Sequence, residues 1–273
     1  MKNFTERKDG RKPSQIRNIS VTFNAFGYAD GSVLFEVGNT KVLCSVSLQQ
    51  GVPHFLKGSK KGWLTAEYSM LPTSTTNRIA RESTLMRKNG RSVEISRLIG
   101  RSLRSIVDLD FFGERTIYVD CDVLQADGGT RTASITGACL ALRAAVANWL
   151  QKGMIRETII TDYVAAISVG VLQDQVLLDL NFQEDSSADA DFNFVLTKSN
   201  TIVEIQGASE GQTVTWDHFE RAKQGALQGV AQLFAITDGV FNKKFLANVA
   251  QNSDNKTKKV PLFSLLNRQD VSK

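Results

Sequence analysis

The sequence predicts an α+β fold in which mixed β-sheets pack against helices. Three observations point to this class: runs of alternating apolar residues occur in pairs, apolar stripes at helical spacing lie between them, and hairpins outnumber the connections that parallel strands need. With 273 residues, the chain is long enough for one large domain with a sizeable core. Hydrophobic residues make up 42% and charged residues 22%, as in ordinary globular proteins.

Alternation predicts strands and hairpins in four places. In GSVLFEVGNTKVLCSVSL, apolar positions alternate on both sides of residues 38–40, which is a hairpin signature. RTIYVDCDVL, residues 115–124, is typical of a further strand. Two more hairpins are expected, in YVAAISVGVLQDQVLLDLNF with its turn at Asp174-Gln175 and in FNFVLTKSNTIVEIQGAS with its turn at residues 198–200.

Three helices are predicted by apolar stripes that repeat every three to four residues. The first lies in VEISRLIGRSLRSIVD, and its opposite face carries a stripe that contains Arg97 and two further arginines. The second begins near Ser134 and ends at Gly153, a residue suited to a helix C-terminus. The third follows Thr215, which is able to cap it, and continues through WDHFERAKQGALQGVAQLFAI.

No internal repeat or low-complexity linker divides the sequence, so one continuous domain over residues 20–240 is expected. A basic N-terminal arm, residues 1–19, precedes this domain. A basic tail, residues 241–273, follows it and contains QNSDNKTKKV, which has no periodic pattern. We expect the tail to be flexible, with at most a short helix near Phe245.

The formal net charge of +5 is unevenly distributed. The arm, the tail and residues 78–104, which hold eight basic and two acidic side chains, are strongly positive beside an otherwise acidic body. This distribution points to a polyanionic partner. Nucleic acid fits better than a membrane, because these segments lack a bulky apolar face and no apolar run approaches the ~20 residues that span a bilayer. A solvated charge run explains the charges of these segments equally well.

The cysteines and the start of the chain indicate a cytoplasmic protein. The first residues lack the apolar core of a signal peptide, and Cys44, Cys121 and Cys139 form no CxxC pair. Neither a zinc site nor a disulfide framework is therefore expected. The two histidines, His54 and His218, have no neighbouring nucleophile pattern, and both are interpreted as structural.

ADGGTR, residues 126–131, stands at the mouth of the second predicted helix. Glycines let the backbone approach an anion, the helix start adds the positive end of its dipole, and a hydroxyl and a guanidinium match phosphate geometry. The spacing differs from that of a Walker loop. Gly129, Thr130 and Arg131 are therefore candidate anion ligands, although Gly-Gly also suits a tight turn without a ligand.

A second cluster, EDSSADADFNFV, places Asp185, Asp189 and Asp191 around the start of a strand. Carboxylates there can hold Mg²⁺ or supply a proton to a leaving oxygen. The alternative is a polar loop that caps the strand, and Asp189 stays open between a metal-shell role and a cap. A phosphate cradle, acids suited to Mg²⁺ and an arginine-rich segment together favour cleavage of a phosphodiester by phosphate.

At these residues the sequence closely resembles the ribonuclease PH family of phosphate-dependent 3′→5′ exoribonucleases, which is related to polynucleotide phosphorylase and the exosome core subunits. The matching stretches cover most of positions 11–240 and are GSVLFEVGNTKVLCSVS, GWLTAEYSMLP, GRSVEISRLIGRSLR, CDVLQADGGTRTASITGA and EDSSADADFNFV. The resemblance implies a single ribonuclease PH-type domain of the ribosomal protein S5 domain 2-like fold. It also implies a homohexameric ring, a trimer of dimers, which removes 3′-terminal nucleotides from RNA, chiefly tRNA precursors, as nucleoside diphosphates.

The resemblance assigns roles to particular residues. Inorganic phosphate as co-substrate would be bound by Gly129, Thr130 and Arg131, which match the family's GTR, and by Arg91 in GRSVEI. Asp185 and Asp191 match the acidic pair of catalysis and Mg²⁺ binding. RNA would be held by three arginines, since Arg78 and Arg81 fall in the family's RNA-contacting segment and Arg97 belongs to the basic stripe.

Two departures from the family bear on these expectations. Thr73 stands where the family commonly has arginine, so one cationic RNA contact is missing and the affinity or tRNA preference is in question. The basic tail extends beyond the usual family end, either to add phosphate contacts or as a disordered passenger.

Two other functions compete with phosphorolysis. A non-catalytic RNA-binding ring subunit of an exosome-like assembly is the first alternative. It is disfavoured because Arg91, Arg131, Asp185 and Asp191 are all present. A hydrolytic metal nuclease is the second; it would leave the cradle without a purpose and release nucleoside monophosphates.

Overall fold

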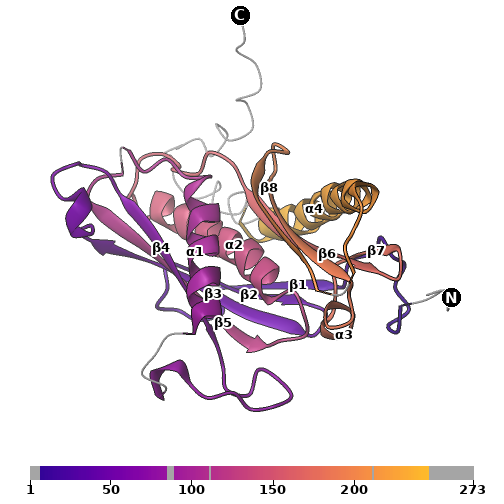
Figure 1. Cartoon of the computed structure of the whole chain (residues 1–273). Coiled ribbons are helices and arrows are strands. Elements are labelled where there is room, and N and C mark those ends of the chain that lie inside the picture. The colour runs from indigo at the N-terminus through magenta and orange to yellow at the C-terminus, as the bar shows by residue number, and fades with distance from the viewer. Residues whose placement is uncertain (1–6, 85–88, 111, 211, 246–273) are drawn as a thin grey trace, which may run out of the picture.

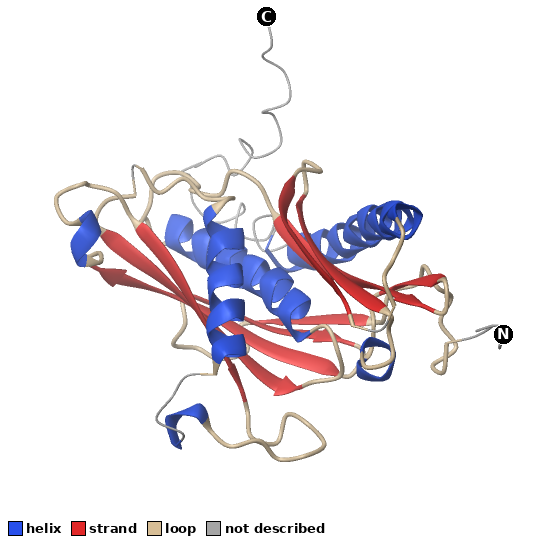
Figure 2. Ribbon diagram, viewed as in Figure 1, coloured by secondary structure: helices blue, strands red, loops and turns tan. Residues whose placement is uncertain are grey.

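The computed structural model describes residues 7–84, 89–110, 112–210 and 212–245, which form four layers (Figures 1 and 2). A five-stranded sheet, helices α1 and α2, a four-stranded sheet, and helix α4 follow one another. The strands are β1 (Ile19–Phe23), β2 (Gly31–Val37), β3 (Thr40–Gln50), β4 (Trp63–Met70), β5 (Arg115–Gln125), β6 (Val164–Leu172), β7 (Gln175–Leu178), β8 (Ala190–Thr197) and β9 (Ile202–Ser209). The helices are α1 (Gly90–Arg104), α2 (Thr130–Gln151), α3 (Phe182–Asp185) and α4 (Trp216–Phe245), with 3-10 turns η1 (His54–Leu56) and η2 (Glu82–Thr84).

The first sheet has the order β1-β2-β3-β5-β4 and is mixed, because β4 runs parallel to β5 while the other pairs are antiparallel. The predicted hairpin of β2 and β3 is confirmed, and Gly38 supplies a left-handed turn residue with φ of +56°. The sequence reasoning did not predict β1 or β4. In β4, buried Leu64, Ala66 and Tyr68 alternate with more exposed residues, so a period of two was present in the sequence.

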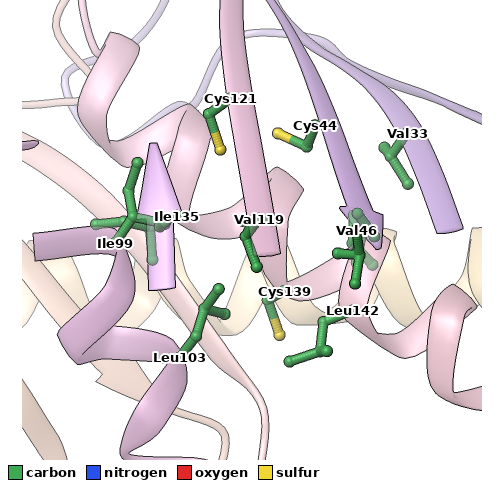
Figure 3. Packing of buried hydrophobic residues seen from close by; sticks show 14 of the residues in the cluster. Val33, Cys44, Val46, Ile99, Leu103, Val119, Cys121, Ile135, Cys139 and Leu142 are labelled. Carbon is green, nitrogen blue, oxygen red and sulfur yellow. The ribbon is translucent and has the colours of Figure 1, made fainter. Parts of the chain in front are cut away.

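Helix α2 lies between the two sheets (Figure 1) and is buried along most of its length. Figure 3 shows Ile135, Cys139 and Leu142 of α2 among buried residues of the first sheet. The predicted start near Ser134 was wrong, because Gly129 already forms the N-cap and the helix begins at Thr130. Gly137 lets α2 approach the first sheet, since a Cβ there would lie 2.8 Å from the sulfur of Cys44. Among the described helices, α2 is long and apolar enough to cross a membrane, but 83% of its apolar window is buried inside the protein, as in a core helix.

The second sheet has the order β7-β6-β8-β9 and is antiparallel. All nine residues of β6 are buried, because α2 covers one face and α4 the other. The backbone N–H of Ala166 donates to the Thr136 hydroxyl on α2 (3.1 Å), whereas Ile167 packs beside Gly229 of α4. Both predicted hairpins are present, although the β6–β7 turn is at residues 173–174, one position earlier than predicted.

Helix α4 extends further than predicted and corrects the expected start of the tail at residue 241. The rings of Phe241 and Phe245 stack with centroids 4.6 Å apart, and both pack edge-on against Phe23 of β1. The guanidinium of Arg143 lies 4.2 Å from the centre of the Phe241 ring. Residues 241–245 therefore belong to the folded domain, whereas the rest of the predicted tail lies outside the described residues.

The N-terminal arm is only partly available to a polyanion, which corrects the interpretation of its charge. In Figure 1 its described residues run beside β7 and α3. Arg7, Arg11 and Arg17 are buried, and they form ion pairs with Asp179 and Glu184. The charges of these three arginines are therefore used inside the protein.

Candidate active site

The two glycines of ADGGTR form a left-handed turn immediately before α2. Gly128 and Gly129 have φ of +77° and +66°, which L side chains rarely adopt. A Cβ on Gly128 would lie 2.6 Å from the carbonyl carbon of Asn181, so the turn also packs too closely for a side chain. Gly129, as N-cap, offers no side chain to the first N–H groups of α2, which have no partner within the helix. The helix start thus presents donors and a positive dipole end to an anion.

Thr130 and Tyr68 form a hydrogen-bonded pair beside this turn. Thr130 is buried, and its hydroxyl oxygen accepts a hydrogen bond of 2.9 Å from the Tyr68 phenol. A hydroxyl that accepts one hydrogen bond can still donate its own proton. The pKa of Tyr68 is raised, because the effect of burial exceeds the opposing effects of the bond to Thr130 and the charges of Arg91 and Arg131. Both arginines therefore act on the same region around the turn.

The two arginines come from the starts of different helices. Arg131 is the second residue of α2, and its Nη1 donates to the Gln206 Oε1 at 2.6 Å and lies 3.5 Å from a Glu94 oxygen. Arg91 is exposed at the start of α1, where Asn89 caps the helix by accepting from the Arg91 N–H at 3.0 Å. The two guanidinium groups are thus carried by separate, anchored helix starts.

The acidic pair approaches this positive region from the second sheet. Asp185 ends the short helix α3, whose first turn is held by a capping box between Asn181 and Glu184, and Asp191 lies at the start of β8. Desolvation raises the pKa of Asp185, the charge of Asp191 raises it further, and Arg91 and Arg131 lower it. Four predicted residues from α1, α2, α3 and β8 therefore form one electrostatic cluster.

Asp189 does not belong to this cluster. Strand β8 begins at Ala190, so Asp189 precedes it, and its carboxylate accepts a hydrogen bond from the Gln173 N–H at 2.9 Å. Its own N–H donates to the Val171 carbonyl at 2.8 Å. These bonds favour the cap over the metal-shell role.

The carboxylates suit a magnesium ion shared with a substrate. Within the described part of the chain, no group of three or more His, Cys, Asp or Glu side chains is placed to hold a metal. Asp185 and Asp191 provide two carboxylates, and Mg²⁺ usually takes one or two carboxylates together with substrate phosphates and water. The donor set therefore fits Mg²⁺ when a phosphorylated substrate is present.

The predicted RNA-binding arginines lie outside this cluster. Arg78 and Arg81 are exposed on the segment between β4 and α1. Arg97 is exposed on α1 and lines a groove of about 710 Å³ along the β4 edge, whose wall also includes Tyr68. Arg97 and Tyr68 therefore line the same groove, whose wall also carries the acidic residues Glu67, Glu82, Asp120 and Asp122.

Two arginines of the basic stripe on α1 already bond other groups of the protein. Arg101 forms two hydrogen bonds to the Glu204 carboxylate, at 2.5 and 2.8 Å. Arg104 donates to the Leu64 carbonyl at 2.9 Å and lies over the Trp63 ring. These bonds correct the view of the whole stripe as an RNA-binding face: Arg101 is exposed but paired with Glu204, and Arg104 is only partly exposed, which leaves Arg97 as the candidate RNA contact of the three.

The residues that hold the turn are not indicated by any of the sequence motifs. Thr40, Tyr68, Arg17 and Asp179 contact the site or its backbone, but none was a candidate. Tyr68 stands in the AEYSMLP stretch, which carried no role beyond the resemblance. For Arg17 the available signal was its charge, which pointed to a polyanion instead.

Comparison with known proteins identifies the family and the fold of the chain. Residues 15–147 match the 3′ exoribonuclease family, domain 1, and residues 162–229 match domain 2 of that family. The fold is similar to rice (Oryza sativa) Rrp46, with 23% identity, a TM-score of 0.69, and coverage of 86% of this chain and 100% of that one. An Archaeoglobus fulgidus exosome with RNA bound to the active site matches at 22% identity and a TM-score of 0.70, covering 84% of this chain and 91% of that one. An archaeal exosome core matches at 22% identity and a TM-score of 0.68, covering 85% of this chain and 91% of that one.

Proposed function

Because the chain belongs to the 3′ exoribonuclease family typified by ribonuclease PH, we propose that it shortens RNA from the 3′ end by phosphorolysis. The observation that carries this proposal is the convergence of Arg91, Arg131 and an uncapped helix start with the carboxylates of Asp185 and Asp191. Phosphorolysis needs both a site for inorganic phosphate and an acidic pair beside it, so it gives a role to each of these two features.

In this proposal the phosphate ion lies at the start of α2. The backbone N–H groups of the first turn and the Thr130 hydroxyl donate to its oxygens, while Arg131 and Arg91 offset its charge. A phosphate oxygen attacks the phosphorus of the 3′-terminal phosphodiester. The bond from that phosphorus to the 3′ oxygen of the preceding ribose breaks, and the products are a nucleoside diphosphate and an RNA shortened by one residue.

The acidic pair serves the leaving oxygen and the scissile phosphate. The raised pKa of Asp185 favours its protonated form at a higher pH than for an ordinary carboxyl, so Asp185 can pass a proton to the 3′ oxygen as it leaves. Asp191, joined by Asp185 only when Asp185 is ionised and carries no proton, would hold Mg²⁺, which would offset negative charge on the scissile phosphate. We expect Asp191→Asn to cut turnover with little change in the unfolding midpoint; near-normal turnover would remove Asp191 from this role.

The finer assignments extend the same proposal. The substrate is the 3′ end of RNA, chiefly of tRNA precursors, and Arg78, Arg81 and Arg97 contact its backbone. A homohexameric ring, a trimer of dimers, in the cytoplasm is the proposed assembly; the neighbouring structures are described as an exosome core and an exosome with RNA in its active site.

A second candidate is a non-catalytic RNA-binding subunit of an exosome-like ring, and the similarity to the two archaeal exosome structures favours it. It gives no purpose to the charges gathered around Asp185.

A product assay separates the two. A tRNA with a short 3′ extension is incubated with Mg²⁺, with and without inorganic phosphate.

Nucleoside diphosphates that form only with phosphate would support phosphorolysis. Monophosphates in both conditions would mean hydrolysis and leave the turn at Gly128-Gly129 without a phosphate substrate. Bound RNA without products would favour the non-catalytic subunit.

A further inference from the structure

The buried Arg17 connects three parts of the molecule that surround the proposed phosphate site. Its guanidinium binds both oxygens of Asp179, with Nε to Oδ2 at 3.0 Å and Nη2 to Oδ1 at 2.7 Å. The same group donates to the carbonyl of Asp127 at 2.6 Å and reaches that of Gly128 at 3.4 and 3.5 Å. Arg17 therefore joins the glycine turn to the end of β7.

Thr40 also binds the backbone of the turn. Its hydroxyl donates to the Gly128 carbonyl at 2.7 Å and accepts from the Asp127 N–H at 3.0 Å. Thr40 is fully buried at the start of β3, so this contact has little freedom to rearrange. Together, Arg17 and Thr40 bind the carbonyls of residues 127 and 128 on the inner side of the turn.

The direction of these carbonyls determines the direction of the donors. In a trans peptide the C=O of one residue and the N–H of the next point in opposite directions. Holding the Asp127 carbonyl inward therefore turns the Gly128 N–H outward, and holding the Gly128 carbonyl does the same for the Gly129 N–H. Arg17 and Thr40 thus orient the backbone N–H groups of Gly128 and Gly129.

The same network reaches the helix that carries Asp185. Asp179 is buried and has a φ of +55°, a left-handed conformation that redirects the chain from β7 toward α3. The Asp127 carboxylate accepts from the Phe182 N–H at 3.4 Å, and the Gly128 backbone packs against residues 180–182. The phosphate turn and the acidic helix are thus fastened to each other.

We propose that Arg17, supported by Thr40, is a positioning residue for the phosphate ion: it fixes the carbonyls of the glycine turn to Asp179, so that the backbone donors face the anion and stay in register with Asp185. This inference rests on the proposed function, because that function places phosphate at the turn. It also gives a role to Arg17, whose charge in the sequence had suggested a contact with RNA.

The test compares Arg17→Lys and Thr40→Val with Arg11→Lys. Lysine keeps the charge beside Asp179 but loses the planar fork that spans to the carbonyls, and valine keeps the shape of threonine without its hydroxyl. Arg11 is a matched control, since it is similarly buried and binds Asp179 and Glu184, while its side chain donates to Asp9, Gln15, Asp179 and Glu184 and not to the turn. The readouts are the KM for phosphate, the KM for RNA, and the rise in unfolding midpoint on adding phosphate.

We expect Arg17→Lys to raise the phosphate KM about tenfold, the lower end of the loss seen for outer-shell residues at metal sites, and to reduce the phosphate-induced rise in unfolding midpoint. Thr40→Val should act in the same direction, and the KM for RNA should stay within about twofold in both. Arg11→Lys should lower the unfolding midpoint while its phosphate KM remains that of the wild type.

An unchanged phosphate KM in both Arg17→Lys and Thr40→Val, or an equal rise in Arg11→Lys, would overturn the inference. If Arg17→Lys does not fold, the isosteric Thr40→Val decides the question. A wild type that phosphate stabilises but that releases no diphosphates would refute the proposed reaction and leave the positioning role testable by unfolding midpoints. A wild type that neither binds nor uses phosphate would refute both.

Discussion

Two groups of arginines, in the N-terminal arm and around α1, show how differently one side chain is used in this molecule. Arg7 is completely buried at its side chain and forms a bidentate ion pair with Glu184 (2.7 and 2.6 Å). Arg97 is exposed on α1. Burial beside a carboxylate makes Arg7 part of the fold, whereas the exposed Arg97 is accessible to a ligand. Charge counted along a sequence does not separate these two uses.

The largest expected effect is on stability and separates the two groups directly. Arg7→Ala removes the two short bonds to the buried Glu184 carboxylate and leaves it the longer 3.3 Å ion pair with Arg11, so we expect the free energy of unfolding to fall by about 3 kcal/mol, the lower end of the range for breaking a buried pair. Arg97→Ala should change it by no more than about 0.5 kcal/mol, as at an exposed position. Urea unfolding of both variants measures the difference. Similar losses in the two would contradict the division into buried and exposed arginines.

The next effect concerns Arg131, which is partly buried yet assigned to phosphate. Removing a charge-assisted hydrogen bond costs about 1.5–3 kcal/mol, so Arg131→Ala should raise the phosphate KM roughly tenfold to a hundredfold. RNA affinity should remain nearly unchanged. Arg101→Ala is the control, because Arg101 is already bonded to Glu204. Equal loss of phosphate and RNA binding in a folded Arg131→Ala would count against the assignment.

A smaller effect is expected for the exposed pair Arg78 and Arg81. If each contacts one RNA phosphate, each alanine variant should reduce the slope of log affinity against log salt by about 0.7, the value for single strands. The loss of affinity should be similar for RNAs of different sequence. Binding titrations over a range of salt concentrations measure this slope. A slope equal to that of the wild type would show that these charges are only solvated.

The smallest effect is a gain in stability from the acidic pair. The folded state raises the pKa of Asp185, so it disfavours the ionised carboxylate. Asp185→Asn should therefore raise the free energy of unfolding slightly near neutral pH. The gain should shrink as the pH falls and the wild-type carboxyl becomes protonated. Urea unfolding at several pH values checks this, and a loss of stability at neutral pH would show that the Asp185 charge stabilises the fold.

Local sequence patterns were sufficient for much of the fold. The hairpins of β2–β3, β6–β7 and β8–β9 follow from alternation and turn residues, because neighbouring strands with short connections pair with each other. Thr215 was correctly predicted as a cap, and its hydroxyl accepts from the His218 N–H at 3.2 Å. The boundaries of α2 and α4 were less accurate. Gly129 starts α2 earlier than its apolar stripe suggests, and packing against Phe23 extends α4 to Phe245.

The residues proposed to bind phosphate and Mg²⁺ were predicted from the sequence, whereas the residues that hold the glycine turn in place were not. Arg91, Arg131, Asp185 and Asp191 stand in recognisable local motifs, and the fold brings their charges together. Arg17 and Asp179, by contrast, are 162 positions apart in the sequence. No local spacing relates two residues that meet only when the arm packs on the second sheet.

The sequence by itself therefore determined the strand and helix types, the turn glycines and the chemistry of the ligands, because these depend on neighbouring residues and backbone conformation. Tertiary structure alone decided which arginines are buried in ion pairs, that Asp189 caps a hairpin while Asp191 faces the cluster, and that α3 is fastened to the glycine turn. The physical reason is that desolvation and pairing of charges depend on groups from distant parts of the chain, which only packing brings within a few ångströms.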